Sequence, residues 1–399
     1  SLNTGLDARL NEGRLTMTFS ANWSWPNPIR FGAGRIAELA EACRAAGISK
    51  PLLVTDRGLA DLPITAQALD ILKRSGLYCD LFADVDPNPN ERNLGVGCVA
   101  FKQGRHDGVI AFGGGSGLDL GKLIAFMAGQ SRPVWEFEDV GDWWTRADAS
   151  AIAPIIAVPT TAGTGSEVGR AAVLTNSETH EKKIIFHPRM MPAQVICDPE
   201  LTVGMPPFIT AGTGVDALAH CIEAYRAPAY APMCDGVALE GMRLCKEYLL
   251  RAYKDGSDLE ARAQMMTAAA AGATAFQKGL GAIHSLSHPI GAHHDTHHGT
   301  TNGVVMLPVL RFNRPAIEDK IARAAAYLGL EPSFDAFLLF IEDLLTALDI
   351  PKTLDALGVS DPDFDALCAS ALKDPTAACN PVALTPENIL PLYKSCFAS

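Results

Sequence analysis

The stretch Gly108-Val-Ile-Ala-Phe-Gly-Gly-Gly-Ser-Gly117 joins an apolar run directly to three consecutive glycines. A short apolar run of this kind predicts a buried strand. Consecutive glycines let backbone N–H groups approach a phosphate without interference from Cβ, and the helix predicted over 118–127 presents its positive end to the same point. The stretch therefore predicts a strand, a phosphate-binding turn and a helix in succession.

The spacing of these glycines matches neither the usual dinucleotide fingerprint nor a P-loop, which would need glycine at Ser116 and a hydroxyl residue at Leu123. A plain turn is therefore the alternative interpretation. Asp56 closes the apolar run 50–55, where a carboxylate can accept hydrogen bonds from an adenosine ribose and repel the extra phosphate of NADP. An ordinary turn aspartate is the alternative there. The segment 159–167 is polar and glycine-rich after another apolar run, and three such segments together favour a nucleotide site.

Short apolar runs alternate with amphipathic stretches throughout the first half of the chain. Short buried strands that alternate with helices indicate βαβ units and a mainly parallel sheet. In such sheets, ligands bind at the carboxyl ends of the strands. The predicted strands are 50–55, 78–82, 108–112, 155–158 and 194–197, and the helices between them include 35–46, 66–75 and 93–103.

After about Pro207 the strand signals end, and helical stretches rich in Ala, Leu, Glu and Met follow one another. Helices that follow helices predict a separate bundle, and 399 residues are enough for two domains. We expect a Rossmann-like α/β dinucleotide-binding domain over 1–206 and an all-helical domain, carrying a metal site, over 207–399. The predicted helices of the second domain are 214–225, 234–253, 259–277, 315–327 and 336–348.

The composition limits the partners and the compartment. A formal net charge of −12 argues against nucleic acid and anionic membranes, because both attract basic surfaces. The ten cysteines form no Cys-x-x-Cys pair and suit a reducing cytosol. Residues 3–16 are polar and predict no secretory signal, and no apolar run is long enough to cross a bilayer. We therefore expect a cytoplasmic protein without nucleic-acid or membrane partners.

A histidine cluster in the second half predicts a metal site. Asp216 and His220 are four residues apart, so a helix places both side chains on one face. His284 and His288 have the same spacing, and six of the ten histidines lie from His284 to His298. A lone buried histidine is more often a hydrogen-bonded core residue, but a cluster with an upstream carboxylate favours a ligand set. One carboxylate and three imidazoles suit a divalent ion such as Fe²⁺ or Zn²⁺, with a coordination position left for substrate.

The chain resembles the iron-containing alcohol dehydrogenases over nearly its whole length. The resemblance implies a dinucleotide-binding α/β domain, an all-helical domain and an active site in the cleft between them. It rests on many ordered segments, namely 87–89, 113–116 with Asp119 and Lys122, 159–167, 198–201, 204–207, 214–220, 284–292 and 298–299.

The resemblance also assigns roles to individual residues. His288 falls on a position close to the nicotinamide that is credited with proton relay, and His284 is both a ligand and part of the catalytic pair. Asp56 matches the NAD-preferring form of the ribose site. The implied metal ligands are Asp216, His220, His284 and His298, and the implied cofactor contacts are Asp56, Asn88, Gly113, Gly114, Gly115, Ser116, Asp119, Thr160, Thr161, Lys183 and His288.

Two comparisons qualify the resemblance. His293, His294 and His297 are extra histidines in a loop where many members have aromatic residues and proline, and they leave the substrate open. The related maleylacetate reductases work without metal and typically have asparagine where this chain has Asp216. The aspartate therefore favours the metal-dependent branch.

The expected reaction is reversible hydride transfer between a small alcohol or aldehyde and NAD, with Fe²⁺ as the metal, Zn²⁺ as the alternative, and a homodimer or larger homo-oligomer as the working form. A dehydroquinate-synthase-like enzyme on the same fold would need several basic residues for an anionic substrate, and the histidine-rich loop offers few fixed charges. A maleylacetate-reductase-like enzyme and a non-catalytic NAD- or metal-sensing module are two further candidates. Every ligand position is filled in this sequence, which favours the metal-dependent dehydrogenase.

Overall fold

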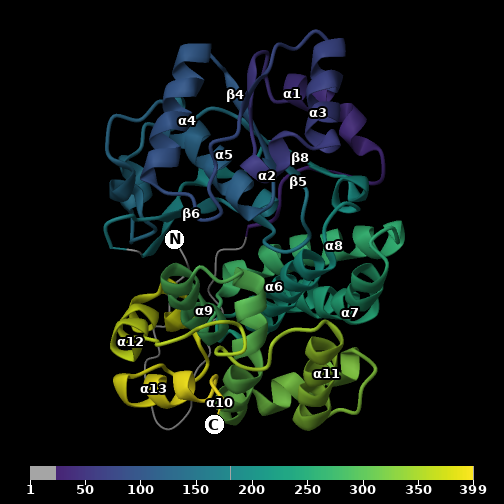
Figure 1. Cartoon of the computed structure of the whole chain (residues 1–399), viewed down its shortest axis with the longest axis vertical. Coiled ribbons are helices and arrows are strands. Elements are labelled where there is room, and N and C mark those ends of the chain that lie inside the picture. The colour runs from purple at the N-terminus through teal and green to yellow at the C-terminus, as the bar shows by residue number, and fades with distance from the viewer. Residues whose placement is uncertain (1–23, 180, 399) are drawn as a thin grey trace.

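The computed structural model describes residues 24–179 and 181–398, so the expectation for residues 3–16 lies outside the described residues. Within these ranges an α/β part is followed by a helical part. Figure 1 shows the α/β part in the upper half of the view and the helical part in the lower half. The expected fold class is confirmed. The boundary between 206 and 207 stays a prediction; the last strand ends at Cys197 and the first long helix begins at Pro207.

The α/β part is built on a six-stranded sheet whose neighbouring strands are all parallel, in the order β1-β8-β5-β4-β2-β3. The central strand β4 is buried along its whole length, which explains its unbroken apolar sequence. Five strands were predicted; the sixth, β1, is only partly buried at the edge of the sheet and carries a weaker apolar signal. The strands are β1 (Ile29–Phe31), β2 (Pro51–Val54), β3 (Asp80–Phe82), β4 (Gly108–Gly113), β5 (Ile155–Pro159) and β8 (Gln194–Cys197).

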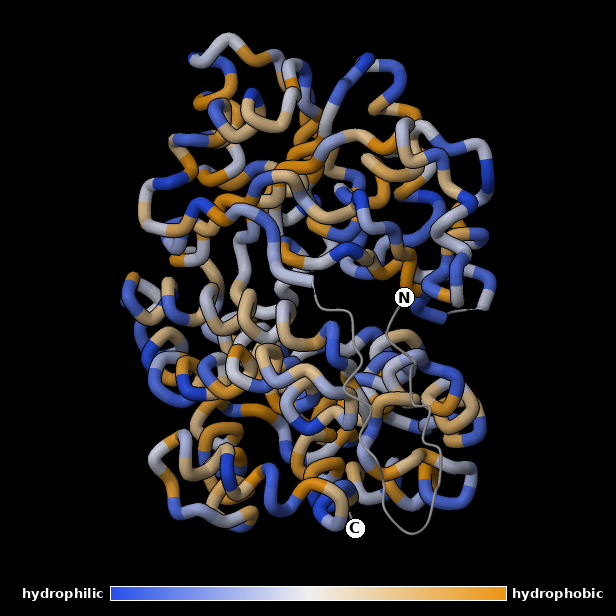
Figure 2. Tube along the Cα trace, turned by 180° about the vertical axis from the view of Figure 1, so that it is seen from behind, coloured by the Kyte–Doolittle hydropathy of each residue, from blue (hydrophilic) through white to orange (hydrophobic). Residues whose placement is uncertain are grey.

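Helices cover both faces of this sheet. Alternate strand residues point to opposite faces, so Leu53 and Ile110 pack in the same core cluster as Leu72, whereas Val54 and Ala111 pack in the cluster of the opposite face. Figure 2 shows hydrophobic residues gathered in the interior of the α/β part and many hydrophilic residues on its outer loops. The first face is covered by α1 (Leu39–Ala45) and α3 (Pro63–Arg74), and the second by α4 (Glu91–Gly104) and α5 (Gly115–Met127).

A two-stranded antiparallel hairpin, absent from the sequence prediction, projects from the α/β part. It consists of β6 (Ala171–Thr175) and β7 (Lys182–Phe186). The buried Lys122 of α5 connects the loop before β6 to this helix, because its Nζ donates to the carbonyls of Ser166, at 3.0 Å, and Ala171. Burial lowers the pKa of Lys122. Lys122, which is one of the residues that carry the family resemblance, therefore has a structural role.

The helical part is centred on α6, which is buried around almost its whole circumference. Its apolar sequence on all sides is that of a helix inside a bundle. Helix α10 begins 17 residues before the predicted start at 315 and continues past Pro308 and Pro315, although proline lacks the N–H that a helix interior uses. The long helices are α6 (Pro207–Arg226), α7 (Pro232–Lys254), α8 (Leu259–Ala275), α9 (Ala282–His294), α10 (His298–Tyr327), α11 (Phe334–Ala347), α12 (Phe364–Lys373) and α13 (Pro386–Lys394).

Short helical turns complete the chain. None of the helices in the described part is both long enough and apolar enough to cross a membrane. The short elements are α2 (Arg57–Ala60), η1 (Arg35–Glu38), η2 (Val134–Phe137), η3 (Trp143–Arg146), η4 (Ala149–Ala151), η5 (Ser166–Val168), η6 (Pro188–Met190), η7 (Pro199–Thr202), η8 (Phe276–Lys278) and η9 (Pro375–Cys379).

The loop after β5 joins the two parts. Gly165 has a φ of +64°, and a Cβ at this position would lie 2.1 Å from the Cβ of Ala273 on α8. Only glycine allows this approach. Part of the glycine content of the segment 159–167 therefore serves the packing of the α/β part against the helical part.

Candidate metal centre and nucleotide site

Three polar residues on one face of the buried helix α6 begin the site. Asp216, His220 and Glu223 follow the i, i+4, i+7 spacing that aligns side chains on a helix. All three are at most 5% exposed. Buried polar groups of this kind need partners of matching chemistry, and those partners come from α9 and from the first turn of α10.

Helix α9 contributes His284, and α10 begins at His298. The Nε2 atoms of His220, His284 and His298 lie 3.5, 3.6 and 3.4 Å from Asp216 Oδ1. The ligand atoms of Asp216, His220 and His284 all lie within 4.8 Å of one another; His298 is outside that group and approaches it through Asp216 Oδ1. The structure therefore brings together the four residues that the sequence suggested as ligands.

These distances fit a metal. For bonds of about 2.0–2.2 Å, the edges of a tetrahedron of ligands measure about 3.3–3.6 Å, which is the separation between Asp216 Oδ1 and each Nε2. Asn302 Nδ2 donates to Asp216 Oδ1 at 2.9 Å and lies 3.4 and 3.3 Å from Nε2 of His284 and His298. One side-chain atom thus lies within 3.4 Å of three of these atoms, so the three atoms converge on one region. Asn302 was not anticipated from the sequence.

The electrostatics of the cluster suit a cation. Burial alone would raise the pKa of Asp216, but the imidazoles of His220, His298 and His284 outweigh it and hold that pKa below its usual value. Burial lowers the pKa of His220 to about 4 and that of His298 well below its usual value. A buried carboxylate that stays ionised beside two neutral imidazoles offers lone pairs to a metal.

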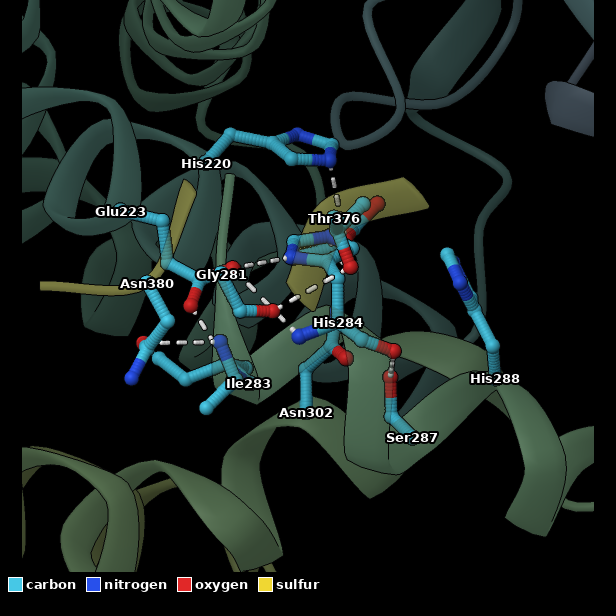
Figure 3. A network of polar contacts seen from close by, with 12 residues as sticks. His220, Glu223, Gly281, Ile283, His284, Ser287, His288, Asn302, Thr376 and Asn380 are labelled. Atoms are coloured by element: carbon cyan, nitrogen blue, oxygen red, sulfur yellow. Dashed lines mark hydrogen bonds and ion pairs between the residues drawn. The ribbon is translucent and has the colours of Figure 1, made fainter. Parts of the chain in front are cut away.

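His284 is held by a second set of buried groups (Figure 3). Its Nδ1 lies 2.6 Å from Glu223 Oε2, and Glu223 also pairs with the buried Arg226 and accepts from the backbone N–H of Ile283 at 2.9 Å. Burial opposes the charged form of His284, but hydrogen bonds to Asp216 and Glu223 raise its pKa to about 9. A proton on Nδ1 shared with Glu223 orients the ring so that Nε2 faces Asp216. The signal for Glu223 was its spacing from Asp216 and His220 on α6.

His288 lies on the same helix, one turn beyond His284, and its ring stacks on that of His298 with centroids 5.3 Å apart. Its Nδ1 lies 2.7 Å from Asp374 Oδ2, and Asp374 Oδ1 accepts from Thr376 Oγ1 at 2.6 Å. Asp374 is 86 residues away in the sequence. No spacing pattern could have connected it with His288.

The predicted phosphate turn is formed at the carboxyl end of β4. Gly113 has a φ of +139°, a conformation that favours glycine. A Cβ on Gly114 would lie 3.1 Å from Thr161, so the turn touches the loop after β5. Thr160 donates its N–H to the carbonyl of Gly113 at 2.9 Å. The two glycine-rich segments therefore form one surface at the edge of the sheet where nucleotides bind.

Other predicted cofactor residues surround this turn. Asp56 caps α2 by accepting from the N–H of Leu59 at 3.0 Å, and its Oδ2 lies 3.6 Å from where a Cβ of Gly113 would be. It is both a turn residue and a neighbour of the glycine turn. Ser116 Oγ donates to the carbonyl of Pro87 at 2.6 Å. Asn88 Nδ2 donates to Asp295 Oδ1 at 3.0 Å and so connects the α/β part to the helical part.

Two predicted contacts are engaged in the protein itself. Asp119 accepts from Ser166 Oγ at 2.5 Å and from the N–H of Val173 at 3.0 Å. Lys183 Nζ lies 2.9 Å from Glu181 and 3.7 Å from Glu138. Both side chains therefore already hold the hairpin in place.

Lys182, the residue before Lys183, faces inward instead. Its Nζ lies 3.7 Å from where a Cβ of Gly291 on α9 would be. Burial lowers the pKa of Lys182, against the pull of Asp119, Asp216 and other carboxylates around it. Lys182 and His288 border one cavity between the α/β part and the helical part. Lys183 borders the same cavity, but its Nζ is paired with Glu181 and Glu138, whereas the Nζ of Lys182 lies toward α9.

The extra histidines have separate positions. His297 caps α10, because its Nδ1 accepts from the N–H of Thr300 at 3.3 Å. His293 borders the cavity of Lys182 and His288. Burial lowers the pKa of His294. None of the three belongs to the group of ligand atoms around Asp216 described above.

A parallel sheet with a glycine turn at its carboxyl edge, beside a buried carboxylate–imidazole cluster, is the arrangement of a metal-assisted dinucleotide oxidoreductase. The family model "Iron-containing alcohol dehydrogenase" matches residues 26–199, and the model of the C-terminal part of the Fe-containing alcohol dehydrogenase family matches residues 210–397. The chain belongs to the iron-containing alcohol dehydrogenase family.

Relatives with established names are similar over most of the chain. A 4-hydroxybutyrate dehydrogenase of Cupriavidus necator is 39% identical, with 88% of this chain and 94% of the relative covered. A choline dehydrogenase of Bacillus subtilis (strain 168) is 36% identical, with 93% and 94% covered. The crystal structure of sulfoacetaldehyde reductase from Bifidobacterium kashiwanohense in complex with NAD⁺ has a TM-score of 0.87 at 29% identity, with 96% of this chain and 100% of that chain covered.

Proposed function

We propose that this protein interconverts alcohols and aldehydes with NAD and a divalent iron ion held by Asp216, His220, His284 and His298. Alcohol–aldehyde interconversion is the activity of the family to which the chain belongs. The observation that carries the metal assignment is the convergence of three imidazole Nε2 atoms on Asp216 Oδ1 at 3.4–3.6 Å. When bound, the ion would supply Lewis acidity that lowers the pKa of the alcohol hydroxyl.

NAD would be held by the glycine turn and the residues around it. Gly113, Gly114, Gly115 and Ser116 provide backbone N–H groups at the start of α5 for the pyrophosphate. Thr160 and Thr161 border the same turn, and Asp56 and Asn88 are assigned to the adenosine ribose. Asp119 accepts a hydrogen bond from Ser166 Oγ and so holds the neighbouring segment 159–167. For the remaining contact, Lys182 is the better candidate than Lys183, because the Nζ of Lys182 lies toward Gly291 on α9, whereas that of Lys183 is paired with Glu181.

His288 is assigned to proton transfer. Its ring stacks on His298, and Asp374 holds its Nδ1 at 2.7 Å. A carboxylate on Nδ1 fixes the ring and leaves Nε2 as the proton acceptor. The pair of His288 and Asp374 would then carry the hydroxyl proton away from the site, a task suited to an imidazole near neutral pH.

The cellular setting is also part of the proposal. All ten cysteines are free, which supports a reducing cytoplasm. A homodimer or larger homo-oligomer is expected from the family resemblance, and the mass measured by light scattering in solution tests it.

The metal assignment is tested by stripping the purified protein with a chelator and reloading it with Fe²⁺ or Zn²⁺ alone. NADH formation from a short-chain alcohol should stop on stripping and return on addition of Fe²⁺. Recovery of activity with Zn²⁺ but not with Fe²⁺ would show that the metal is zinc and not iron. Full turnover in protein shown to be metal-free would overturn the proposal.

The NAD preference is tested at Asp56. Asp56→Ser removes the carboxylate but keeps a side-chain oxygen that can cap α2. We expect kcat/KM with NADP⁺ to rise about tenfold or more, because about 1.4 kcal/mol of relieved repulsion toward the extra phosphate is a factor of ten. Asp61→Ser, at the other end of α2, is the matched control. If the ratio of kcat/KM with NAD⁺ to kcat/KM with NADP⁺ is unchanged in Asp56→Ser, Asp56 does not contact the adenosine ribose.

A further inference from the structure

A second cavity lies beside the metal cluster, between the hairpin and the helical part. Its volume is about 160 Å³. Pockets for drug-sized ligands measure about 300–1,000 Å³, so this cavity suits a molecule of only a few carbon atoms. It is lined by Arg170, Ala171 and Phe186 from the α/β part, by Phe276 and Leu280 from the helical part, and by residues that include Thr376.

The cavity adjoins the active centre on two sides. The Phe276 ring makes an edge contact with the ring of His220, with centroids 5.1 Å apart. Thr376 Oγ1 donates to Asp374, the carboxylate that holds His288. A substrate in this cavity would therefore lie beside both a proposed metal ligand and the proposed proton acceptor.

Most polar groups at the cavity wall are already engaged. Gln277 exchanges hydrogen bonds with the backbone of Ser24, and Thr274 Oγ1 donates to a carbonyl of its own helix. The guanidinium of Arg170 is different. It lies over the Phe186 ring, 5.5 Å from the centroid, and within residues 24–179 and 181–398 no hydrogen bond or ion pair to its guanidinium is found.

We propose that the physiological substrate is a short alcohol whose far end carries an anionic group, a carboxylate, bound by Arg170. The inference rests on the proposed function and adds the class of substrate. Arginine remains protonated in proteins and matches a carboxylate with two parallel hydrogen bonds. The carboxylate takes no part in the reaction: hydride leaves the hydroxyl-bearing carbon for NAD⁺, the hydroxyl proton is released, and an aldehyde acid is formed.

The opposite charge is the alternative that the test must separate. Trp25 and Phe276 border the cavity, as does Asp139. Aromatic rings with a carboxylate can also receive a quaternary ammonium group. Asp139 already has an interaction of its own, whereas the Arg170 guanidinium has no hydrogen bond or ion pair within the described residues, so the wall favours an anion.

The experiment compares three alcohols of similar length, namely 4-hydroxybutanoate, 1,4-butanediol and choline, on the metal-loaded wild type and on Arg170→Gln. We expect the wild type to favour 4-hydroxybutanoate over the diol by about tenfold to a hundredfold in kcat/KM, the range for a hydrogen bond to a charged group. In Arg170→Gln that preference should disappear because KM for 4-hydroxybutanoate rises. For the diol, kcat/KM should change by less than about threefold, a limit far below the loss expected for the acid. Arg170→Lys should retain part of the preference.

Arg146→Gln is the matched control, because Arg146 also lies over an aromatic ring, that of Trp143, but does not line the cavity. It should leave the preference unchanged. If the wild type oxidises the diol with the same kcat/KM as the acid, or prefers choline, the proposed substrate class is overturned. The proposed dehydrogenase activity would still stand. An equal loss of kcat/KM for all three alcohols in Arg170→Gln would also overturn the proposed substrate class. No NADH with any alcohol would instead remove the proposed function itself.

Discussion

Replacing Asp216 by asparagine should empty the metal site and lower kcat/KM for alcohol oxidation by about a thousandfold or more. The carboxylate oxygen Oδ1 is the atom on which His220, His284 and His298 converge. An amide of the same shape cannot carry the negative charge that a divalent ion needs. Loss of metal removes several kcal/mol of charge stabilisation, and about 4 kcal/mol corresponds to a thousandfold in rate.

Metal content by elemental analysis and NADH formation on the same preparation measure the two effects together. Asp319→Asn is the control, since Asp319 is an exposed aspartate on α10, the helix that carries His298. It should leave both quantities unchanged. A full complement of metal in Asp216→Asn would show that Asp216 is not a ligand.

Replacing Glu223 by glutamine should weaken metal binding by about 10–100-fold, the range for groups that orient a ligand. It should also lower the free energy of unfolding by about 3–5 kcal/mol, because it leaves the guanidinium of Arg226 buried without its carboxylate. The side chains of Glu223 and Arg226 are both 0% exposed. Both effects have one cause, since the same carboxylate holds His284 and neutralises Arg226.

The chain offers a matched control for this pair. Glu240 and Arg243 have the same i, i+3 spacing on α7, but their side chains are 43% and 33% exposed. Glu240→Gln should change the free energy of unfolding by less than about 1 kcal/mol, as is usual for surface pairs. Urea unfolding and competition with a metal-binding dye measure the two variants. Equal effects on stability would contradict the role of burial, and unaltered metal affinity in Glu223→Gln would show that Glu223 does not orient His284.

The sequence was sufficient where the signal is local. The strand and glycine turn at 108–117 form as predicted, because a short apolar run and a positive φ at Gly113 are properties of the segment itself. The alignment of Asp216 with His220 follows from the period of one helix. The ordered motifs identified the family, and the family models confirm it.

Contacts between distant elements were decided by packing. Asp374 reaches His288 across 86 residues, and Asn302 reaches Asp216 across the same number. The cavity around Arg170 exists only because the hairpin packs against the end of α8 and the segment near Thr376. No local period encodes such contacts, since they depend on how whole helices and strands are arranged.

The two lysines at the start of β7 show most clearly what the sequence alone does not predict. The family resemblance implies Lys183 as a cofactor contact. In the structure the Nζ of Lys183 is paired with Glu181 and Glu138, whereas the Nζ of Lys182 lies toward Gly291 on α9. Successive side chains of a strand point to opposite faces. The sequence by itself determined that two lysines stand at this point of the hairpin. Only the tertiary structure decided which of them is buried beside α9 and which is paired with carboxylates, because that depends on which side of the hairpin packs against α9.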